Sequence, residues 1–211
     1  MPGGTLTLRV MRLALLAAIG WFVMTVARTA LFQTFDHEDF SESLTIKVEH
    51  LPLLFPVHMF TGALALVLVP AAFLLRRQPR WHRPMGAIAA ADVALAGLTA
   101  YPVAWIAPIS PWSAAGFTAQ ASVWLALLAL GIRNILLGRV AAHRAAMLLM
   151  LAVTSGAVFF RVFLALWALL ADGRHFVLFY SCNAWAGWLL PLTLTAAWLR
   201  RNEARFPRPG T

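Results

Sequence analysis

Long apolar runs alternate with short polar segments along the whole chain. The apolar runs cover about residues 13–32, 51–75, 85–107, 116–137, 145–170 and 177–199. Each run is long enough for a helix that crosses a bilayer, which needs about 20 residues. The pattern predicts an all-α fold: a polytopic transmembrane helix bundle with six spans, forming a single domain over residues 1–211.

The composition agrees with this fold class. Hydrophobic residues make up 61% of the 211 residues and charged residues only 12%, whereas a soluble domain is roughly 45–50% apolar and about 25% charged. So few charges cannot cover a water-facing surface, which excludes a soluble enzyme and a nucleic-acid binder. The single cysteine, Cys182, excludes an intramolecular disulfide and a CxxC motif.

The positions of the 17 basic residues predict the orientation of the bundle. The N-terminus, the second and fourth connecting segments and the C-terminal tail carry 12 of them, whereas the opposite segments carry Lys47 and Arg174, with Arg28 near the end of the first run. Because cytoplasmic loops are enriched in Lys and Arg, both termini are predicted to be cytoplasmic. The net charge of +9 then reflects topology, and the expected partner is the lipid bilayer rather than a nucleic acid.

The first apolar run has two interpretations. Two arginines precede it and small residues, Ala27 and Ala30, follow its core, as in a cleaved signal peptide. The run is long for the apolar region of a signal peptide, and Trp21, Phe22 and Met24 are bulky. We therefore favour a retained span.

Three polar residues fall in the outer half of the predicted membrane region. At 1.5 Å per residue, His58 lies on the order of 10 Å deep in the second span and Arg161 on the order of 13 Å deep in the fifth. Asn183 lies at a similar depth in the sixth span. A buried guanidinium without a carboxylate needs carbonyl oxygens, water or an anionic ligand. Arg161 therefore either binds backbone carbonyls and Asn183, snorkels outward, or holds a ligand.

A second polar group lies in the inner half. Asp92 and Arg133 fall on consecutive spans at comparable depth, which favours an ion pair between them. His82 and His143 each open a span directly after a basic turn. They are either solvated residues of the interface or two ligands that converge on one metal ion or haem iron.

The fifth span carries a polar and thioether stripe. Its members are spaced by 4, 3, 4 and 7 residues and therefore share one helix face: His143, Met147, Met150, Thr154 and Arg161. Methionines in such a stripe are core residues before they are ligands. The acidic segment 33–50 has oxygen and imidazole groups for a divalent cation, but its spacing matches no defined metal loop and favours a solvated loop.

The sequence resembles a bacterial membrane-protein family called domain of unknown function 2306. The resemblance rests on LPLLFPVHMFTG, RWHRPMG, GFTAQASVWLALLALGIRN, AAHRAAMLL and AVFFRVF, and it covers about residues 50–165. The family pattern is carried by His58 with Gly62, His82 and Arg83 with Gly86, His143 and Arg144 with Met147, and Arg161. Ala146 departs from the pattern, because an aromatic residue usually precedes the methionine. The resemblance implies the fold, the site positions and a bacterial inner (plasma) membrane location, but no activity.

Three functions fit these residues. The first is a b-type haem or metal-binding electron carrier, similar in outline to the cytochrome b561 group, with cofactor-binding residues His58, His82, His143, Arg161 and Asn183 and a metal held by His82 and His143. The second is a transport or small-ligand binding protein for an anionic or quinone-like ligand. The third is an accessory or assembly subunit without chemistry, whose small residues permit close contact with a membrane-protein partner or a second copy. Hydrolase motifs are absent from the sequence.

Overall fold

The computed structural model describes residues 3–36 and 41–202 of the chain. Seven α-helices and one 3-10 turn form these residues, and no strand occurs among them. The elements are α1 (Gly3–Gln33), α2 (Glu42–His50), α3 (Leu54–Leu74), η1 (Leu75–Arg77), α4 (Pro79–Trp105), α5 (Pro111–Leu136), α6 (Val140–Leu170) and α7 (Phe176–Arg201). The predicted all-α class is therefore confirmed.

Five of the described helices are long and apolar enough to cross a membrane: α3 together with η1, α4, α5, α6 and α7. The first predicted span lies inside α1, whose shorter apolar part covers Ala17–Gln33. The chain is thus a multi-pass helical protein with five clear candidate spans.

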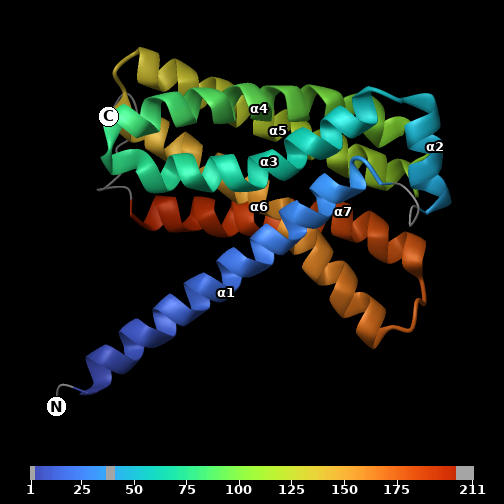
Figure 1. Cartoon of the computed structure of the whole chain (residues 1–211), viewed down its shortest axis with the longest axis horizontal. Helices are drawn as coiled ribbons and strands as arrows, with labels where there is room; N and C mark the ends of the chain where they lie inside the picture. Colours follow the sequence, from blue (N-terminus) through green and yellow to red (C-terminus); the bar gives the residue numbers. More distant parts are fainter. Residues whose placement is uncertain (1–2, 37–40, 203–211) are drawn as a thin grey trace.

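The spanning helices pack as consecutive antiparallel neighbours. Helices α3, α4 and α5 lie side by side, and α6 packs against α5 and α7 (Figure 1). The end of the bundle with α2 and the α6–α7 turn is called the outer end, and the opposite end is called the inner end. The outer halves of α6 and α7 turn away from α3, and α1 crosses the bundle obliquely on the side where α6 and α3 separate (Figure 1).

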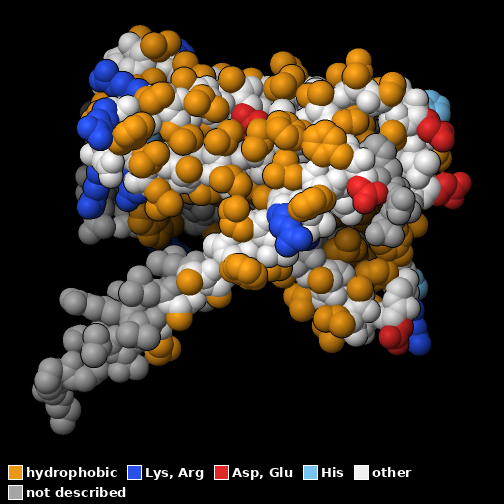
Figure 2. Space-filling model, viewed as in Figure 1, with side chains coloured by type: hydrophobic (Ala, Val, Ile, Leu, Met, Phe, Trp, Pro, Cys, Tyr) orange, Lys and Arg blue, Asp and Glu red, His pale blue; other side chains and the backbone are white. Residues whose placement is uncertain are grey.

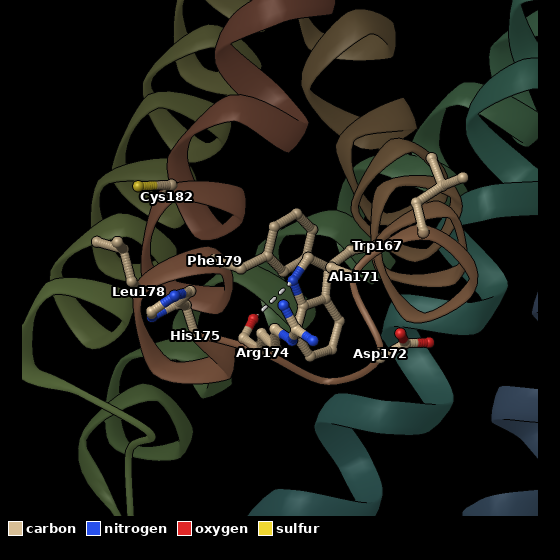
Figure 3. A pocket seen from close by; sticks show the side chains of 9 residues that line it. Trp167, Ala171, Asp172, Arg174, His175, Leu178, Phe179 and Cys182 are labelled. Atoms are coloured by element: carbon tan, nitrogen blue, oxygen red, sulfur yellow. Dashed lines mark hydrogen bonds between the residues drawn. The ribbon is translucent and has the colours of Figure 1, made fainter.

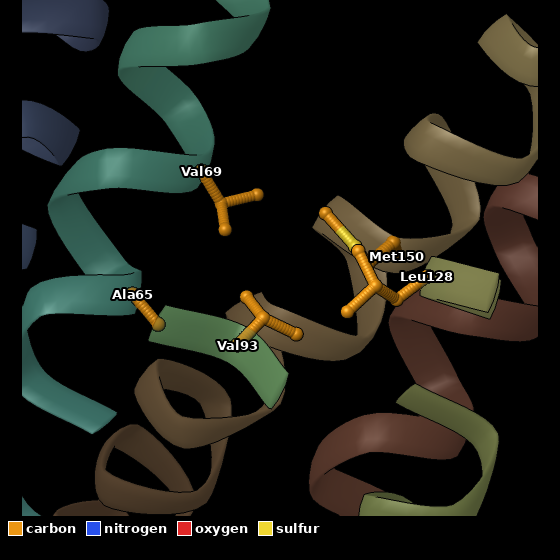
Figure 4. Close-up of a cluster of buried hydrophobic side chains, with 5 residues drawn as sticks. All are labelled: Ala65, Val69, Val93, Leu128 and Met150. Atoms are coloured by element: carbon orange, nitrogen blue, oxygen red, sulfur yellow. The ribbon is translucent and has the colours of Figure 1, made fainter. Parts of the chain in front are cut away.

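The centre of the bundle is a compact apolar cluster that joins four helices. Ala65 and Val69 from α3 meet Val93 from α4, Leu128 from α5 and Met150 from α6 (Figure 4). All five side chains are buried, and Val93 has no exposed surface. This central cluster fixes the register of α3 to α6, so depths in the bundle can be compared by counting residues from it.

Helix α1 joins the bundle through its second half. Its Val26 and Ala27 pack with Leu66 of α3, and Ala157 and Val158 of α6 complete this contact. Helix α1 therefore covers the line along which α3 and α6 begin to separate.

Glycines bring α5, α6 and α7 together at van der Waals distance. A Cβ atom at Gly156 of α6 would lie 2.7 Å from the Cβ of Trp188 of α7 and 2.9 Å from Nε2 of Gln120 of α5. At Gly116 of α5 a Cβ atom would lie 3.0 Å from the carbonyl oxygen of Ala184. Small residues at such contacts allow the close backbone approach that stabilises helix pairs in membranes.

Charged side chains separate between the two ends of the bundle. Basic side chains gather at one end in the space-filling view, and most acidic ones lie at the other (Figure 2). The exposed arginines of the inner end are Arg76, Arg77, Arg80, Arg83, Arg133, Arg139, Arg144, Arg200 and Arg201. Trp81, Trp105, Trp112 and Trp198 are exposed near helix ends, where amphipathic rings meet the membrane interface.

The structure departs from the predicted elements at two kinds of position. The acidic segment 33–50 was expected to be a loop, but part of it forms helix α2. Helices α4, α5 and α6 begin about five residues earlier than the apolar runs, at Pro79, Pro111 and Val140. Proline is compatible with the first turn of a helix, because the N–H that it lacks would have no partner within the helix there. The helices can therefore begin before the apolar runs, and hydropathy alone places their starts too late.

Candidate functional site

The two inner histidines each connect the helices of one hairpin. Nδ1 of His82 on α4 lies 2.9 Å from the carbonyl oxygen of Ala72 on α3, and Nδ1 of His143 on α6 lies 2.9 Å from that of Gly131 on α5. A carbonyl oxygen only accepts, so each Nδ1 carries the proton and donates it. In the neutral ring this arrangement leaves a lone pair on Nε2, as in metal-ligating histidine, and it is equally suited to holding a hairpin together.

The carbonyl groups that bond to the two inner histidines lie at comparable depth. Ala72 follows Val69 by three residues on α3, and Gly131 follows Leu128 by three residues on α5, and Val69 and Leu128 meet in the central cluster. Because each ring lies within hydrogen-bond distance of its carbonyl, both rings stand about one helical turn inward of the cluster.

The outer histidine has the same geometry. Nδ1 of His58 on α3 donates to the carbonyl oxygen of Ala96 on α4 at 3.0 Å and lies 3.3 Å from Oγ1 of Thr99. The Thr99 hydroxyl in turn donates to the carbonyl oxygens of Leu95 and Ala96. Nε2 of His58 has no hydrogen-bond partner among the described residues.

A glycine with open space beside it follows two of the histidines by one turn. A Cβ atom at Gly62, four residues after His58, would meet no side chain or neighbouring helix within 4 Å. The same holds for Gly86, four residues after His82. Residues four apart lie on one helix face, so each of these rings borders open space.

Arg161 lies in the outer half of α6 and is exposed. It follows Met150 of the central cluster by eleven residues, about 16 Å along the helix. The ring of His58 is bonded to Ala96, three residues outward of Val93, and therefore lies nearer to the cluster. Three helical turns also keep Arg161 on the inward face of α6 that carries Met150. Its guanidinium donates one described hydrogen bond, from Nη1 to the carbonyl oxygen of Ala157 at 3.0 Å.

The open space beside Gly62 is here called the outer opening. His58 lies one turn outward of Gly62 on the same face of α3. Helix α1 packs against α3 and α6 along its inner edge. An exposed guanidinium on an inward helix face indicates polar space inside the bundle rather than contact with lipid.

Asn183 does not join Arg161. Its Nδ2 donates to the carbonyl oxygen of Phe160 at 2.9 Å, its exposed fraction is 2%, and its Oδ1 is buried without a partner. The side chain therefore connects α7 to α6. Tyr180, one turn before Asn183, is the α7 residue that acts electrostatically on Arg161.

The predicted ion pair between Asp92 and Arg133 is wrong. Asp92 is 9% exposed in the middle of α4, and its Oδ2 has no partner. Arg133 is exposed in the last turn of α5, five residues inward of Leu128 of the central cluster. Asp92 lies only one residue inward of Val93, so the two residues differ in depth by about 6 Å.

Lys47 of α2 is a residue that the sequence did not single out. Its ammonium donates to the carbonyl oxygens of Val103, at 2.8 Å, and of Ile106, which end α4. These carbonyls have no partner within the helix, and a cation there is favoured by the helix dipole. Burial lowers the pKa of Lys47 below its ordinary value. Lys47 also acts electrostatically on His58, so it adds positive charge beside the outer opening.

Comparison with known proteins identifies the family. The family model described as "Predicted membrane protein (DUF2306)" matches residues 55–199, which is more than half of the chain. The chain belongs to this family. No curated protein and no solved structure matches the chain.

Membership of the DUF2306 family confirms the resemblance seen in the sequence. All residues that carried it, from His58 to Arg161, lie inside the matched region. In this family member the pattern His58–Gly62 borders the outer opening, and the pattern His82–Gly86 borders open space at the inner end. Met147, by contrast, packs its Cε atom against Gly131, and Met150 is buried in the central cluster. The methionines of the stripe are therefore packing residues.

Two further places in this family member carry polar groups. No group of three or more possible metal-ligating residues occurs in the ranges 3–36 and 41–202; the predicted cation loop falls partly on residues 37–40, outside them. An open hollow lies at the outer turn between α6 and α7, where Trp167 stacks on Phe179 and donates to the carbonyl oxygen of Arg174 (Figure 3). His175 and Cys182 line the same hollow. Its charged residues are exposed, so it lacks the enclosed polar groups of a ligand site.

Proposed function

We propose that this membrane protein binds a small anionic or quinone-like ligand in the outer opening. The observation that carries the proposal is the exposed guanidinium of Arg161 on the face of α6 that carries Met150, in the same outer half of the bundle as the open space at Gly62. Arg161 donates only to a carbonyl of its own helix, which leaves further N–H groups directed to other partners. Arg161 and Lys47 supply positive charge in the outer half of the bundle.

The arrangement supports recognition of a carboxylate, an oxyanion or a quinone carbonyl. Arginine offers a planar set of donors suited to such oxygens. The aromatic side chains of Phe117, Phe160 and Tyr180, in edge-to-face contact, give α5, α6 and α7 a rigid wall next to Arg161. Transport of the bound ligand across the membrane is a further step of the same proposal.

Arg161→Ala tests the proposed site. Benzoate, inorganic phosphate and a short-chain ubiquinone serve as carboxylate, oxyanion and quinone probes. At least one should raise the melting temperature of the purified wild type, because a ligand that binds the folded state stabilises it. Loss of a charged hydrogen bond of about 1.5–3 kcal/mol should weaken that binding roughly 10- to 100-fold.

Arg133→Ala is the matched control, since Arg133 is an exposed arginine of the inner end. It should leave the stabilisation by the probe unchanged. An equal shift in the wild type and Arg161→Ala, or no shift with any probe, rejects the site.

The orientation and location belong to the same proposal. We place the protein in the bacterial inner membrane with six spans, α1 included, and with both termini cytoplasmic. The arginine-rich inner end supports this orientation through the positive-inside rule. The lipid bilayer is the partner favoured by exposed apolar side chains such as Trp21 and Phe32. A membrane-protein partner, a homo-oligomer and a role as an accessory subunit stay predictions.

Haem b or a metal ion held by His82 and His143 also stays a prediction. The free Nε2 atoms of both rings favour it. An absorption spectrum of protein made with sufficient haem decides this alternative.

A further inference from the structure

The turn between α3 and α4 concentrates positive charge at the inner end of the bundle. Four exposed arginines lie within eight residues of sequence, on η1 and on the first turns of α4: Arg76, Arg77, Arg80 and Arg83. They belong to the basic side chains that gather at this end in the space-filling view (Figure 2).

No carboxyl group of the described residues balances this charge. Asp92 lies in the middle of α4, and the other acidic residues of ranges 3–36 and 41–202 belong to the outer end: Asp36, Glu42, Glu49 and Asp172. The guanidinium groups of the turn therefore need anions that the described part of the chain does not supply.

Two of these guanidinium groups are held against aromatic rings. The guanidinium carbon of Arg76 lies 4.2 Å from the centroid of the Phe73 ring, and its Nη1 donates to the Phe73 carbonyl oxygen at 3.0 Å. The guanidinium carbon of Arg80 lies 5.1 Å from the centroid of the Trp81 ring. Because an arginine has five N–H donors, both groups keep donors for a further acceptor while the ring contacts restrict their motion.

Exposed apolar side chains lie directly beside these charges. Leu74 is 73% exposed and Trp81 is 52% exposed. Tryptophan is typical of the membrane interface, where its ring lies at the level of the lipid headgroups. The turn thus combines cations with an apolar surface, which matches a lipid, whereas a free phosphate ion would use the cations alone.

We propose that the turn between α3 and α4 binds anionic phospholipid from the leaflet at the inner end. Arg76 and Arg80 donate to the phosphate oxygens, for which the planar guanidinium group is well suited, and an acyl chain packs beside Trp81. Basic residues next to a membrane span attract anionic lipid, each by roughly fivefold in affinity. This lipid site does not depend on the outer opening.

Native mass spectrometry of the purified protein measures the lipid binding. The wild type and Arg76→Gln/Arg80→Gln are titrated with phosphatidylglycerol, which is anionic, and with phosphatidylcholine, which carries no net charge. The wild type should bind phosphatidylglycerol more tightly by about tenfold or more. The double variant should bind it roughly 25-fold more weakly than the wild type does, because two arginines are lost.

Arg200→Gln/Arg201→Gln is the matched control. It removes two exposed arginines from the last turn of α7, at the same end of the bundle. This variant should keep the affinity for phosphatidylglycerol to within about fivefold. Equal losses in the two double variants would show that the general charge of the inner end attracts the lipid, which overturns the site. Equal binding of the two lipids to the wild type, or displacement of phosphatidylglycerol by inorganic phosphate, also overturns it.

Discussion

Gly156→Ala should destabilise the protein by about 1–3 kcal/mol, the usual cost of overpacking a tight contact. The new Cβ atom would lie 2.7 Å from the Cβ and 3.0 Å from the Cα of Trp188. The second of these atoms belongs to the backbone, so α6 and α7 must move apart to admit a single methyl group. This contact lies inward of the point where α6 and α7 leave the bundle. Its loss would also loosen the aromatic wall of Phe117, Phe160 and Tyr180 next to Arg161.

Gly20→Ala is the control for this substitution. Gly20 lies in α1, and a Cβ atom there would meet no other side chain or neighbouring helix within 4 Å. The change should be neutral or stabilising by up to about 1 kcal/mol, because alanine favours a helix more than glycine does. Unfolding by SDS or urea in detergent measures the change in the free energy of unfolding for both variants. Equal stabilities of the two variants would show that the three-helix contact is not close-packed.

Gly62→Leu should abolish ligand binding while the protein stays folded. The leucine side chain would occupy the open space one turn from His58, where no other side chain or neighbouring helix lies within 4 Å of a Cβ at this position. The helix itself should tolerate the change, since leucine is a strong helix former. Titration of the probe that stabilises the wild type should give no saturable binding.

Gly86→Leu is the matched control for Gly62→Leu. Gly86 has the same open surroundings and the same spacing to a histidine, but it lies at the inner end. This variant should bind the probe with wild-type affinity. If both variants bind as the wild type does, the outer opening is not where the ligand lies; if both lose binding, the effect of position 62 is not local.

Hydropathy predicted most of the helical architecture because bilayer crossing imposes long apolar runs. It located α3 to α7 to within about six residues at their starts, and the missing residues were polar ones such as Arg80 and Arg83 that continue a helix beyond the apolar region. Helix α2 was missed because a short helix with no buried residues has no apolar periodicity to detect.

The candidate site was predicted only in part. Burial cost pointed to His58 and Arg161, which both lie in the outer half of the bundle. Pairings between helices could not be read from one sequence, because they depend on rotation and register. Asp92 and Arg133 were paired wrongly for that reason, and Asn183 was grouped with Arg161 although it bonds to Phe160. Lys47 gave no signal at all, since its partners are backbone carbonyls.

The central claim is that water reaches an open site between α3 and α6 from the outer side of the membrane. Cysteine labelling in whole cells tests it most directly, with Gly62→Cys and Gly86→Cys in a Cys182→Ser background, because Cys182 is exposed. A membrane-impermeant maleimide should label Gly62→Cys in intact cells and Gly86→Cys only after permeabilisation, and a probe that binds should protect the first. Labelling of Gly86→Cys in intact cells, or no labelling of Gly62→Cys under either condition, would contradict the account.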